Sequence, residues 1–410
     1  MPLVLLCSAT AEVDALALRA AARGLDVELI SLRDVLPAAG GQTRAVETTT
    51  ARAAAEALGG RALDGVVALD PRGALLAAAV AEALGLIWHP PGAVRTALDA
   101  VRARGAQMAA GLPVPWFFTM RAGDEIAAVA DRLAFPCRVV RLAEGPTARG
   151  IRARSPAEFG AALACLREGG GREHDPAGQG ARGAAHGMER DSVLVEADAG
   201  GRTFTLCGFL EHGALRVVAI AEHLETGPVA GADAEAAITP CDLSAVEQRA
   251  LAGMVAHAAA AIGLRHGPVQ AACAAAGPAG RFVRACLPYP VGAPLADVVR
   301  FATHGREGVT LGELTLRHAI DAPLDAFGRE AVTAGVLSVR VREDARGAAV
   351  TGWEAAAAVP GVERAGPAPE GSADVGWVVA HGSTAADVTR MLREAARHLQ
   401  PAGGRAPGVD

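Results

Sequence analysis

The chain has 410 residues, a length that predicts two to three domains. Its formal net charge of −6 and pI near 6.0 give it no overall attraction to nucleic acid or to an anionic membrane. All 39 residues of its Lys+Arg count are arginine and asparagine is absent, which excludes mechanisms that need a Schiff-base lysine, a phosphate-loop lysine or an asparagine metal ligand.

The first ninety residues alternate short apolar runs with segments of helical spacing. The expected strands are Leu3–Cys7, Val27–Ser31 and Val66–Leu69, and the expected helices are Glu12–Arg23, Thr48–Leu58 and Gly73–Leu84. This alternation predicts a parallel sheet covered by helices. The turn after the first strand, Ser8-Ala9-Thr10, contains no glycine, so the dinucleotide-binding fingerprint is absent.

Further elements follow in the middle and last parts of the chain. A helix over 96–110 should end at Gly111, because Pro113 and Pro115 require an extended backbone. The other expected helices are Asp124–Leu133, Pro156–Leu166 and Ser244–Ile262, and the expected strands are Cys137–Leu142, Ile151–Arg154, Val193–Val195, Thr203–Leu210, Leu215–Ala221, Val269–Cys273 and Arg281–Cys286. Residues 168–190 are of low complexity and predict a mobile loop.

The cysteines and the N-terminal residues indicate the cellular compartment of the protein. The seven cysteines are scattered and contain no C-x-x-C pair, a pattern typical of small buried thiols in a reducing cytoplasm. The start MPLVLLCSAT has no basic segment and predicts a first strand rather than a signal peptide. The stretch 73–88 is interrupted by Glu82 and is too short to span a bilayer. We therefore expect a cytoplasmic protein.

Several segments occur in the order of a known family. They are AAGLPVP at 109–115, FPCRVVR at 135–141, RGI at 149–151, VLVE at 193–196 followed by Gly201, AIGL at 261–264 with GPV at 267–269, and VGWVVAHG at 375–382. Together they resemble the ATP-grasp superfamily of carboxylate–amine ligases, nearest to its L-amino-acid-ligase and biotin-carboxylase-like branches.

The resemblance implies an α/β fold with four parts. These are an N-terminal parallel-sheet domain (1–93), an ATP-grasp domain (94–329) with a lid subdomain at about 112–195, a small α+β C-terminal unit (330–400) and a disordered tail (401–410). It also implies an activity in which ATP and a carboxylate form an acyl-phosphate that an amine then attacks. Magnesium would hold the transferring phosphoryl group.

The positions that carry this chemistry in the family are substituted here. Two phosphate-binding lysines of the family fall on Ala100 and Arg141, although the later arginine of the first motif is kept as Arg104. The serine of the glycine loop falls on Ala148, and the ribose-binding glutamate on Thr203. The magnesium ligands Glu, Glu and Asn and the arginine after them fall on Ala272, Ala285, Leu287 and Tyr289.

One observation does not depend on the alignment. Residues 248–296 contain no Asp or Glu, where the density of 45 acidic residues in 410 predicts about five. Magnesium usually takes its protein anchors from one or two carboxylates, which alanine and leucine cannot replace. The sequence therefore predicts that the metal site is lost.

The candidate nucleotide-binding residues that remain are Arg104, Arg141, Arg149, Gly150 and Glu196. Arg141 can fork onto phosphate oxygens, and Glu196 matches the hinge at which the family holds the adenine edge. Arg281 and Arg284 lie on the strand that carries metal ligands in the family. They either neutralise a triphosphate in place of magnesium or extend to solvent, and the second interpretation is favoured. The histidines occur singly, which argues against a replacement metal site.

Two functions follow. The favoured one is a pseudoenzyme or accessory scaffold of a biosynthetic pathway, which binds a small molecule in the interlobe cleft or supports an active ligase. The alternative is a divergent ATP-dependent carboxylate–amine ligase that uses an arginine-lined nucleotide site. ATP is the nucleotide to test in both cases.

Overall fold

The computed structural model describes residues 1–8, 12–32, 52–54, 56, 58, 60–145, 148, 150–169, 191–198, 200–226, 229, 233–277, 280–303, 306–340, 350–368 and 374–401. The chain divides into two compact units, which we call unit 1 (Met1–Val218, Ser244–Val291 and Gly312–Ala326) and unit 2 (Ala219–Leu243, Gly292–Leu311 and Phe327–Asp410). Most of the predicted helix at 48–58, the predicted loop at 168–190 and the predicted tail lie outside the described residues. The four-part domain division stays a prediction.

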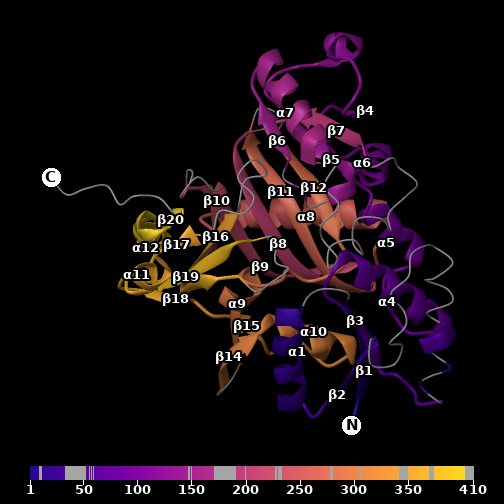
Figure 1. The fold of residues 1–410 in the computed structure, drawn as a ribbon. Helices are drawn as coiled ribbons and strands as arrows, with labels where there is room; N and C mark the ends of the chain where they lie inside the picture. Colours follow the sequence, from indigo (N-terminus) through magenta and orange to yellow (C-terminus); the bar gives the residue numbers. More distant parts are fainter. Residues whose placement is uncertain are drawn as a thin grey trace. The chain divides into compact units, whose positions relative to one another are not determined.

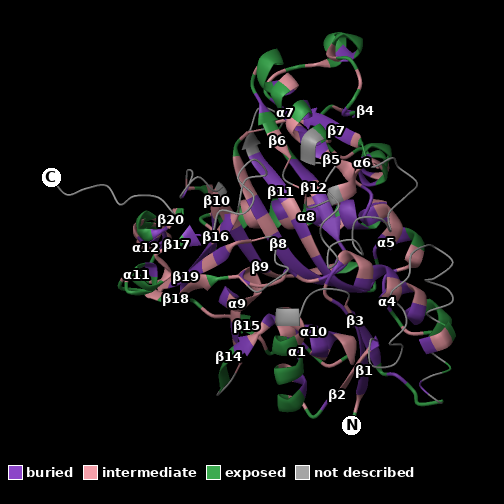
Figure 2. Cartoon of the chain, in the orientation of Figure 1, coloured by how far each residue is buried: buried purple, intermediate pink, exposed green. Residues whose placement is uncertain are grey.

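Unit 1 begins with the predicted parallel sheet (Figure 1). Its strands β1 (Leu3–Cys7), β2 (Glu28–Ser31) and β3 (Gly65–Ala68) have the order β2-β1-β3, with helix α1 (Glu12–Gly24) between β1 and β2 and helix α4 (Pro71–Leu84) after β3. Alternate residues of β1 enter two separate apolar clusters, one with α4 and one with α1 and helix α10 (Leu311–Ala319). All five residues of β1 are buried because side chains cover both faces of the sheet (Figure 2).

The junction between β1 and α4 is fixed by two residues. The Asp70 carboxylate caps α4 by accepting the Gly73 N–H at 2.6 Å, and it also accepts the Ser8 hydroxyl at 2.9 Å. A Cβ atom at position 73 would overlap the Cys7 carbonyl oxygen. Glycine is therefore needed there for the helix to start so close to the end of β1.

A second, antiparallel sheet of unit 1 has the strand order β4-β7-β5-β6. Its strands are β4 (Phe117–Arg121), β5 (Cys137–Arg141), β6 (Ile151–Ala153) and β7 (Ser192–Ala197). Helix α7 (Pro156–Gly169) and the 3₁₀ helices η1 (Ile126–Arg132) and η2 (Leu142–Glu144) accompany it. The fully buried Phe159 of α7 packs into the core of this sheet. Strand β4 was not predicted from the sequence, and the helix expected at 124–133 is the shorter η1.

Three further strands of unit 1 pair antiparallel in the order β12-β11-β8, namely β8 (Arg202–Glu211), β11 (Gly267–Gly277) and β12 (Gly280–Leu287). Helices α5 (Pro91–Ala97), α6 (Ala100–Ala109) and α8 (Ala245–Ile262) pack against β12. The single helix predicted at 96–110 is thus divided in two. The break occurs because the Asp99 side chain accepts the N–H groups of Val101 and Arg102 and starts a new helix.

Unit 2 contains the α+β pattern predicted for residues 330–400. It contributes the last part of β9 (Ala214–Glu225), followed in sheet order by β10 (Asp233–Thr239), β16 (Thr333–Arg340), β19 (Gly376–Gly382) and β18 (Val362–Pro367). Its other elements are α9 (Leu295–Val298), β13 (Arg300–Thr303), β14 (Arg306–Thr310), β15 (Gly328–Arg329), β17 (Val350–Thr351), α11 (Trp353–Ala357), α12 (Ala385–His398) and β20 (Gln400–Pro401). Helix α12 buries Val388, Leu392 and Ala395 against the sheet, a one-sided helical spacing.

The cysteines are free thiols, and five of the seven are buried. Burial, with a smaller contribution from the charge of Asp198, raises the pKa of Cys137 to about 11. Such thiols are inert at neutral pH, as the scattered pattern predicts. Within the described residues, no helix has the length and apolar character needed to cross a membrane.

Unit 1 also gathers four histidines, His89, His212, His266 and His318. The rings of His266 and His318 stack at 4.6 Å, and those of His212 and His266 lie 5.0 Å apart. The contacts of His89 define its neutral form, because Nε2 faces the Pro268 carbonyl at 3.0 Å while Nδ1 accepts the Arg265 N–H at 3.3 Å. A second proton on Nδ1 would point at that N–H.

Burial lowers the pKa of these rings. It lowers the pKa of His89 to about 4 and, with repulsion from His266 and His89, that of His318 to about 3. The pKa of His266 is also lowered, chiefly by burial and then by His212. His266 and His318 line a cavity of about 10 Å³, which holds one water molecule at most, so a charged ring would be poorly hydrated.

We expect stability to fall in acid because of these histidines. Their folded-state pKa values lie below the unfolded value of 6.5, so the unfolded chain binds more protons below that pH. Their contribution is complete above pH 6.5 and is lost as the pH falls towards 4 and 3. H318F should reduce the pH dependence of the unfolding free energy between pH 6.5 and 4.5 by up to about 1.4 kcal/mol per pH unit.

Urea unfolding at several pH values measures this slope. H257Q, at an exposed histidine of α8, is the control and should keep the slope of the unmodified protein. An unchanged slope in H318F would contradict the prediction.

Candidate functional site

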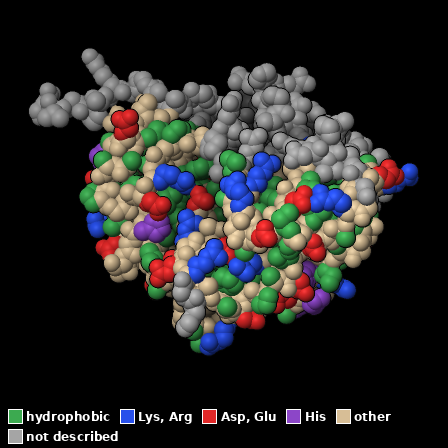
Figure 3. Space-filling model, turned by 90° about the horizontal axis from the view of Figure 1, so that it is seen from below, with side chains coloured by type: hydrophobic (Ala, Val, Ile, Leu, Met, Phe, Trp, Pro, Cys, Tyr) green, Lys and Arg blue, Asp and Glu red, His purple; other side chains and the backbone are tan. Residues whose placement is uncertain are grey.

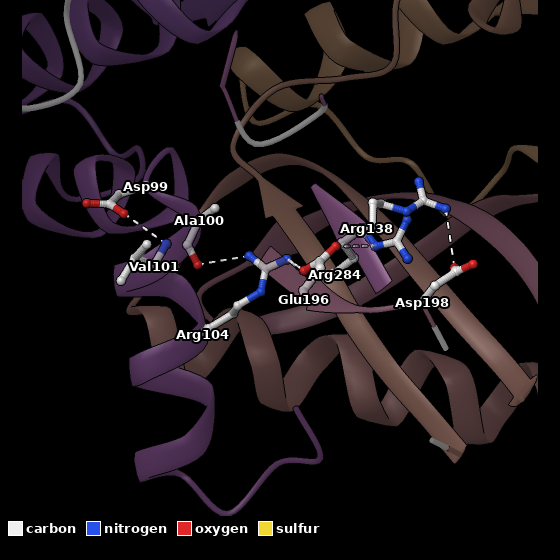
Figure 4. Close-up of polar contacts among 8 residues, drawn as sticks. All are labelled: Asp99, Ala100, Val101, Arg104, Arg138, Glu196, Asp198 and Arg284. Atoms are coloured by element: carbon white, nitrogen blue, oxygen red, sulfur yellow. Dashed lines mark hydrogen bonds and ion pairs between the residues drawn. The ribbon is translucent and has the colours of Figure 1, made fainter. Parts of the chain in front are cut away.

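The candidate site of unit 1 is built around a buried ion pair between α6 and β7. Arg104 donates from Nη2 to Glu196 Oε2 and from Nη1 to the Ala100 carbonyl at 2.9 Å (Figure 4). The side chain of Arg104 is 4% exposed and that of Glu196 1%. The cap at Asp99 sets where α6 starts, and this start places Arg104 one turn later, facing the sheet. The structure thus brings together two of the predicted residues, Arg104 and Glu196.

A second guanidinium reaches Glu196 from β12. Arg284 Nε lies 3.5 Å from Glu196 Oε1, the oxygen that Arg104 leaves open. The register of β11 with β12 changes here, because Ala272 pairs with Ala285 whereas Cys273 pairs with Val283. Arg284 is therefore the extra residue of a β-bulge, a feature that redirects a side chain. The sequence favoured a solvent-facing Arg284, and this interpretation is wrong.

Arg281 of the same strand extends towards solvent, as the sequence predicts. It is 45% exposed on its side chain and lies 3.9 Å from Glu247. Only one of the two arginines of β12 therefore turns towards Glu196. The bulge makes the side chains of Arg281 and Arg284 point in different directions, and the sequence pattern alone did not reveal the bulge.

Three more charged residues, Arg138, Arg152 and Asp198, belong to the same set of charged side chains. Arg138 of β5 pairs in register with Glu196 and lies 3.6 Å from the Asp198 carboxylate through Nη2. Arg152 of β6 makes a close ion pair with the same carboxylate. We call Arg104, Arg138, Arg152, Arg284, Glu196 and Asp198 the arginine–carboxylate cluster. It contains four cations and two anions.

The electrostatics of the cluster are unusual at Arg284. Burial, and after it repulsion from Arg138, lowers the pKa of this guanidinium to about 10, with only partial compensation from Glu196. The fold thus holds a cation where the charge is disfavoured, which is typical of functional sites. On the face of the molecule in Figure 3, by contrast, arginine and carboxylate side chains are interspersed among the described residues.

The other predicted nucleotide-binding residues lie apart from the cluster or outside the description. Arg141 donates from Nη2 to the Leu166 carbonyl of α7. It lies three positions from Arg138, and residues an odd number apart face opposite sides of a strand. Gly150 has φ 66°, and a Cβ there would lie 2.5 Å from the Val139 carbonyl oxygen, so its backbone lies close to β5. Arg149 lies outside the described residues. The nucleotide role of all five residues stays a prediction.

The hinge backbone near Glu196 is engaged within the protein. The Ala197 N–H donates to the Trp116 carbonyl at 2.9 Å, and the Asp198 N–H donates to the Pro136 carbonyl at 3.0 Å. These two amides close the β4-β7-β5 sheet, so neither points freely at a ligand. Arg138, which the sequence analysis missed, could have been found from its pairing with Glu196 if the register had been known.

The positions that the sequence resemblance matches to metal ligands lie together in the structure. Ala272 and Ala285 lie directly opposite each other on β11 and β12, and Leu287 opposes Gln270 two residues along. Ala285 and Leu287 are buried in the apolar cluster that contains β1 residues, and Ala272 packs against that cluster. Methyl and isobutyl groups therefore occupy the place, and they offer no oxygen to a cation. Among the described residues, no group of three or more His, Cys, Asp or Glu could hold a metal ion.

Several solved structures are similar to this chain over nearly its whole length. No protein-family model and no curated protein matches the sequence. L-amino acid ligase from Bacillus licheniformis has a TM-score of 0.69 at 18% identity, with 98% of each chain covered. N5-carboxyaminoimidazole synthase from Aspergillus clavatus, solved with ADP and 5-aminoimidazole ribonucleotide, has 0.64 at 14%, covering 96% of this chain and 98% of its own. The β,γ-ATP complex of biotin carboxylase from Campylobacter jejuni has 0.57 at 13%, covering 97% and 91%.

These similarities show that the chain has the ATP-grasp fold. The predicted fold class is therefore confirmed, and so is the resemblance to ATP-grasp carboxylate–amine ligases at the level of fold. At 13–18% identity they establish the fold alone.

Replacing Glu196 should strongly destabilise unit 1. E196Q removes the counter-charge of the buried Arg104, and breaking a buried pair from one side costs about 3–5 kcal/mol. The control is E56Q, which breaks the exposed Arg52–Glu56 pair and should cost less than about 1 kcal/mol. Denaturant titrations of both variants measure their free energies of unfolding. Equal losses of stability in E196Q and E56Q would contradict a structural role for the buried pair.

Proposed function

We propose that this protein uses the ATP-grasp fold as a ligand-binding scaffold and does not carry out magnesium-dependent phosphoryl transfer. One observation carries the proposal. The positions that match the two metal-binding glutamates of the family are Ala272 and Ala285, a cross-strand pair that packs with the apolar cluster around β1. The fold is kept while the oxygen donors are replaced by methyl groups.

The chemistry of the metal explains why this substitution matters. Magnesium bridges phosphate oxygens and fixes the in-line geometry of the transferring group. It requires near-octahedral oxygen ligands and takes protein carboxylates as anchors. Introducing the ion beside Ala272 and Ala285 would bury its charge against hydrocarbon without a protein ligand. A nucleotide could still bind, but its γ-phosphoryl group would lack the ion that promotes transfer.

The proposed scaffold belongs in the cytoplasm and acts in a biosynthetic pathway, by binding a small molecule or by supporting an active ligase. ATP is the first ligand to test, because proteins of this fold have been solved with ADP or ATP. The candidate contacts are Arg104, Arg141, Arg149, Gly150 and Glu196.

A second function is favoured by the arginine–carboxylate cluster. Arg138 and Arg284 place cationic groups beside Asp198 and Glu196, and the sequence resemblance matches Glu196 to the nucleotide-binding hinge of the family. A divergent carboxylate–amine ligase could use them to screen a triphosphate. Guanidinium groups do not bridge and orient phosphate oxygens as a metal does, so such an enzyme would be slow.

The two functions predict different calorimetry and turnover. If the protein is a scaffold, the full-length chain should bind ATP with the same affinity in the presence of magnesium in excess over the nucleotide and in the presence of EDTA. It should also release no phosphate above the rate of the protein-free solution over a panel of amino acids. An active ATP-grasp ligase serves as the positive control. Magnesium-dependent binding together with amino-acid-dependent phosphate release would establish the ligase instead.

A further inference from the structure

Unit 1 contains a small cavity beside its histidines. Four chain segments line it, namely β3, residues 87–88 before α5, residues 266–268 at the start of β11, and α10. Three polar side chains of this lining, Trp88, His266 and His318, are only 8%, 9% and 6% exposed. The cavity measures about 10 Å³, and one water molecule needs about 10–15 Å³, so there is room for a single water and for no larger ligand.

Each of these three side chains has a buried nitrogen that lacks a hydrogen-bond partner. The atoms are Trp88 Nε1, His266 Nδ1 and His318 Nε2, and no protein group in the described part of the chain bonds to any of them. A buried polar atom of this kind is destabilising unless a water molecule satisfies it. Three such atoms around one cavity indicate a polar occupant, because an apolar one would leave all three unsatisfied.

The local geometry suits a bridging oxygen atom. Gly267 has φ 131°, and a Cβ there would lie 3.3 Å from Trp88 Nε1 and 2.9 Å from His89 Nε2. Glycine therefore keeps the space beside the indole nitrogen free of a side chain. The rings of His266 and His318 stack with 21° between their planes and 4.6 Å between their centres. Two hydrogen bonds from one oxygen, each about 2.9 Å long, can span such a separation.

We propose that this cavity is a binding site for one ordered water molecule, which accepts the indole N–H of Trp88 and donates to His266 Nδ1 and His318 Nε2. The indole nitrogen can only donate, so it uses a lone pair of the water oxygen. Both hydrogens of the water then remain for the two imidazoles, and each ring must present an unprotonated nitrogen. The site thus assigns a tautomer to each ring, with the proton of His266 on Nε2 and that of His318 on Nδ1.

The surroundings of His318 favour the neutral ring that this arrangement requires. Burial lowers the pKa of His318, and His266, His89, Arg216 and His212 lower it further by repulsion. The ring is therefore uncharged at neutral pH. A second proton on Nε2 would replace the acceptor that the water needs with a donor.

His266 has charged neighbours of both signs. Burial, and then His212, lowers its pKa, whereas the carboxylates of Asp321 and Glu211 act in the opposite direction, and the net effect is a lowered pKa. His266 is therefore also neutral at pH 7, the condition under which its Nδ1 can accept a hydrogen bond. Both acceptors are thus available to the same water molecule.

The water joins three segments that are far apart in the sequence. Trp88 precedes α5, His266 precedes β11, and His318 lies near the end of α10. Protonation of either imidazole would turn an acceptor into a donor that faces the water, so the link depends on neutral rings. The inference does not depend on the proposed function, because no outcome of the ATP experiments would alter it.

A crystal structure of the full-length protein at neutral pH, together with nitrogen NMR of its side chains, tests the site. The crystal structure should show a water oxygen within about 3.2 Å of all three nitrogens. The NMR shifts should place the proton on Nε2 of His266 and on Nδ1 of His318. The indole N–H of Trp88 should show a nuclear Overhauser contact with a long-lived water. That of Trp353 should not, because it donates to the Val350 carbonyl at 2.9 Å.

A pair of variants tests the contribution of His318. H318F removes one acceptor and should abolish the contact between Trp88 and the water, whereas the control H257Q, at an exposed histidine of α8, should keep it. Any of three results would overturn the proposal: no water oxygen between the nitrogens, the opposite proton position on either ring, or an unchanged water contact in H318F. The first two are measured on the unmodified protein, so they decide even if H318F does not fold.

Discussion

The ion pair between Arg104 and Glu196 constrains much of unit 1. Both side chains are almost fully buried, so neither charge can be satisfied by water and each depends on the position of the other. That dependence links the start of α6, set by Asp99, to the register of β7 in its sheet. Arg284 adds β12 to the same point through its bulge. Small shifts in any of these elements would leave a buried charge uncompensated.

Strands β11 and β12 carry two neighbouring places of different character. At Ala272 and Ala285, which the sequence resemblance matches to metal-binding glutamates, the side chains are methyl groups that lie in or against the apolar cluster around β1. At Arg284 a charged side chain has instead been directed towards Glu196. The strands keep their pairing in both places, because backbone hydrogen bonds hold the ladder whatever side chains it carries. The fold can thus persist while its chemistry changes.

The regular elements were predictable because their signals are local. Strand β1 has its predicted bounds, Leu3–Cys7, and α4 and α8 begin and end within two residues of their predictions. The division of the helix at Asp99 was missed, although an aspartate before a helical run is an N-cap signal. Strand β4 was missed although Pro115 precedes it and Gly123 follows it, and both residue types are boundary signals. Arg138 was missed because its partner Glu196 is 58 positions away in the chain and meets it only in the sheet.

The sequence by itself indicated which fold to expect and which residue types are missing from the strands that carry metal ligands in the family. Without lysine, and without any acidic residue between 248 and 296, no choice of register could supply the family's phosphate lysines or metal carboxylates on those strands. Tertiary structure alone decided which arginines matter. Arg141 turns to α7 and Arg281 to Glu247, while Arg138 and Arg284 meet at Glu196 and Asp198. Charge pairing acts over a few ångströms, and those distances are set by strand register and a bulge that non-local contacts create.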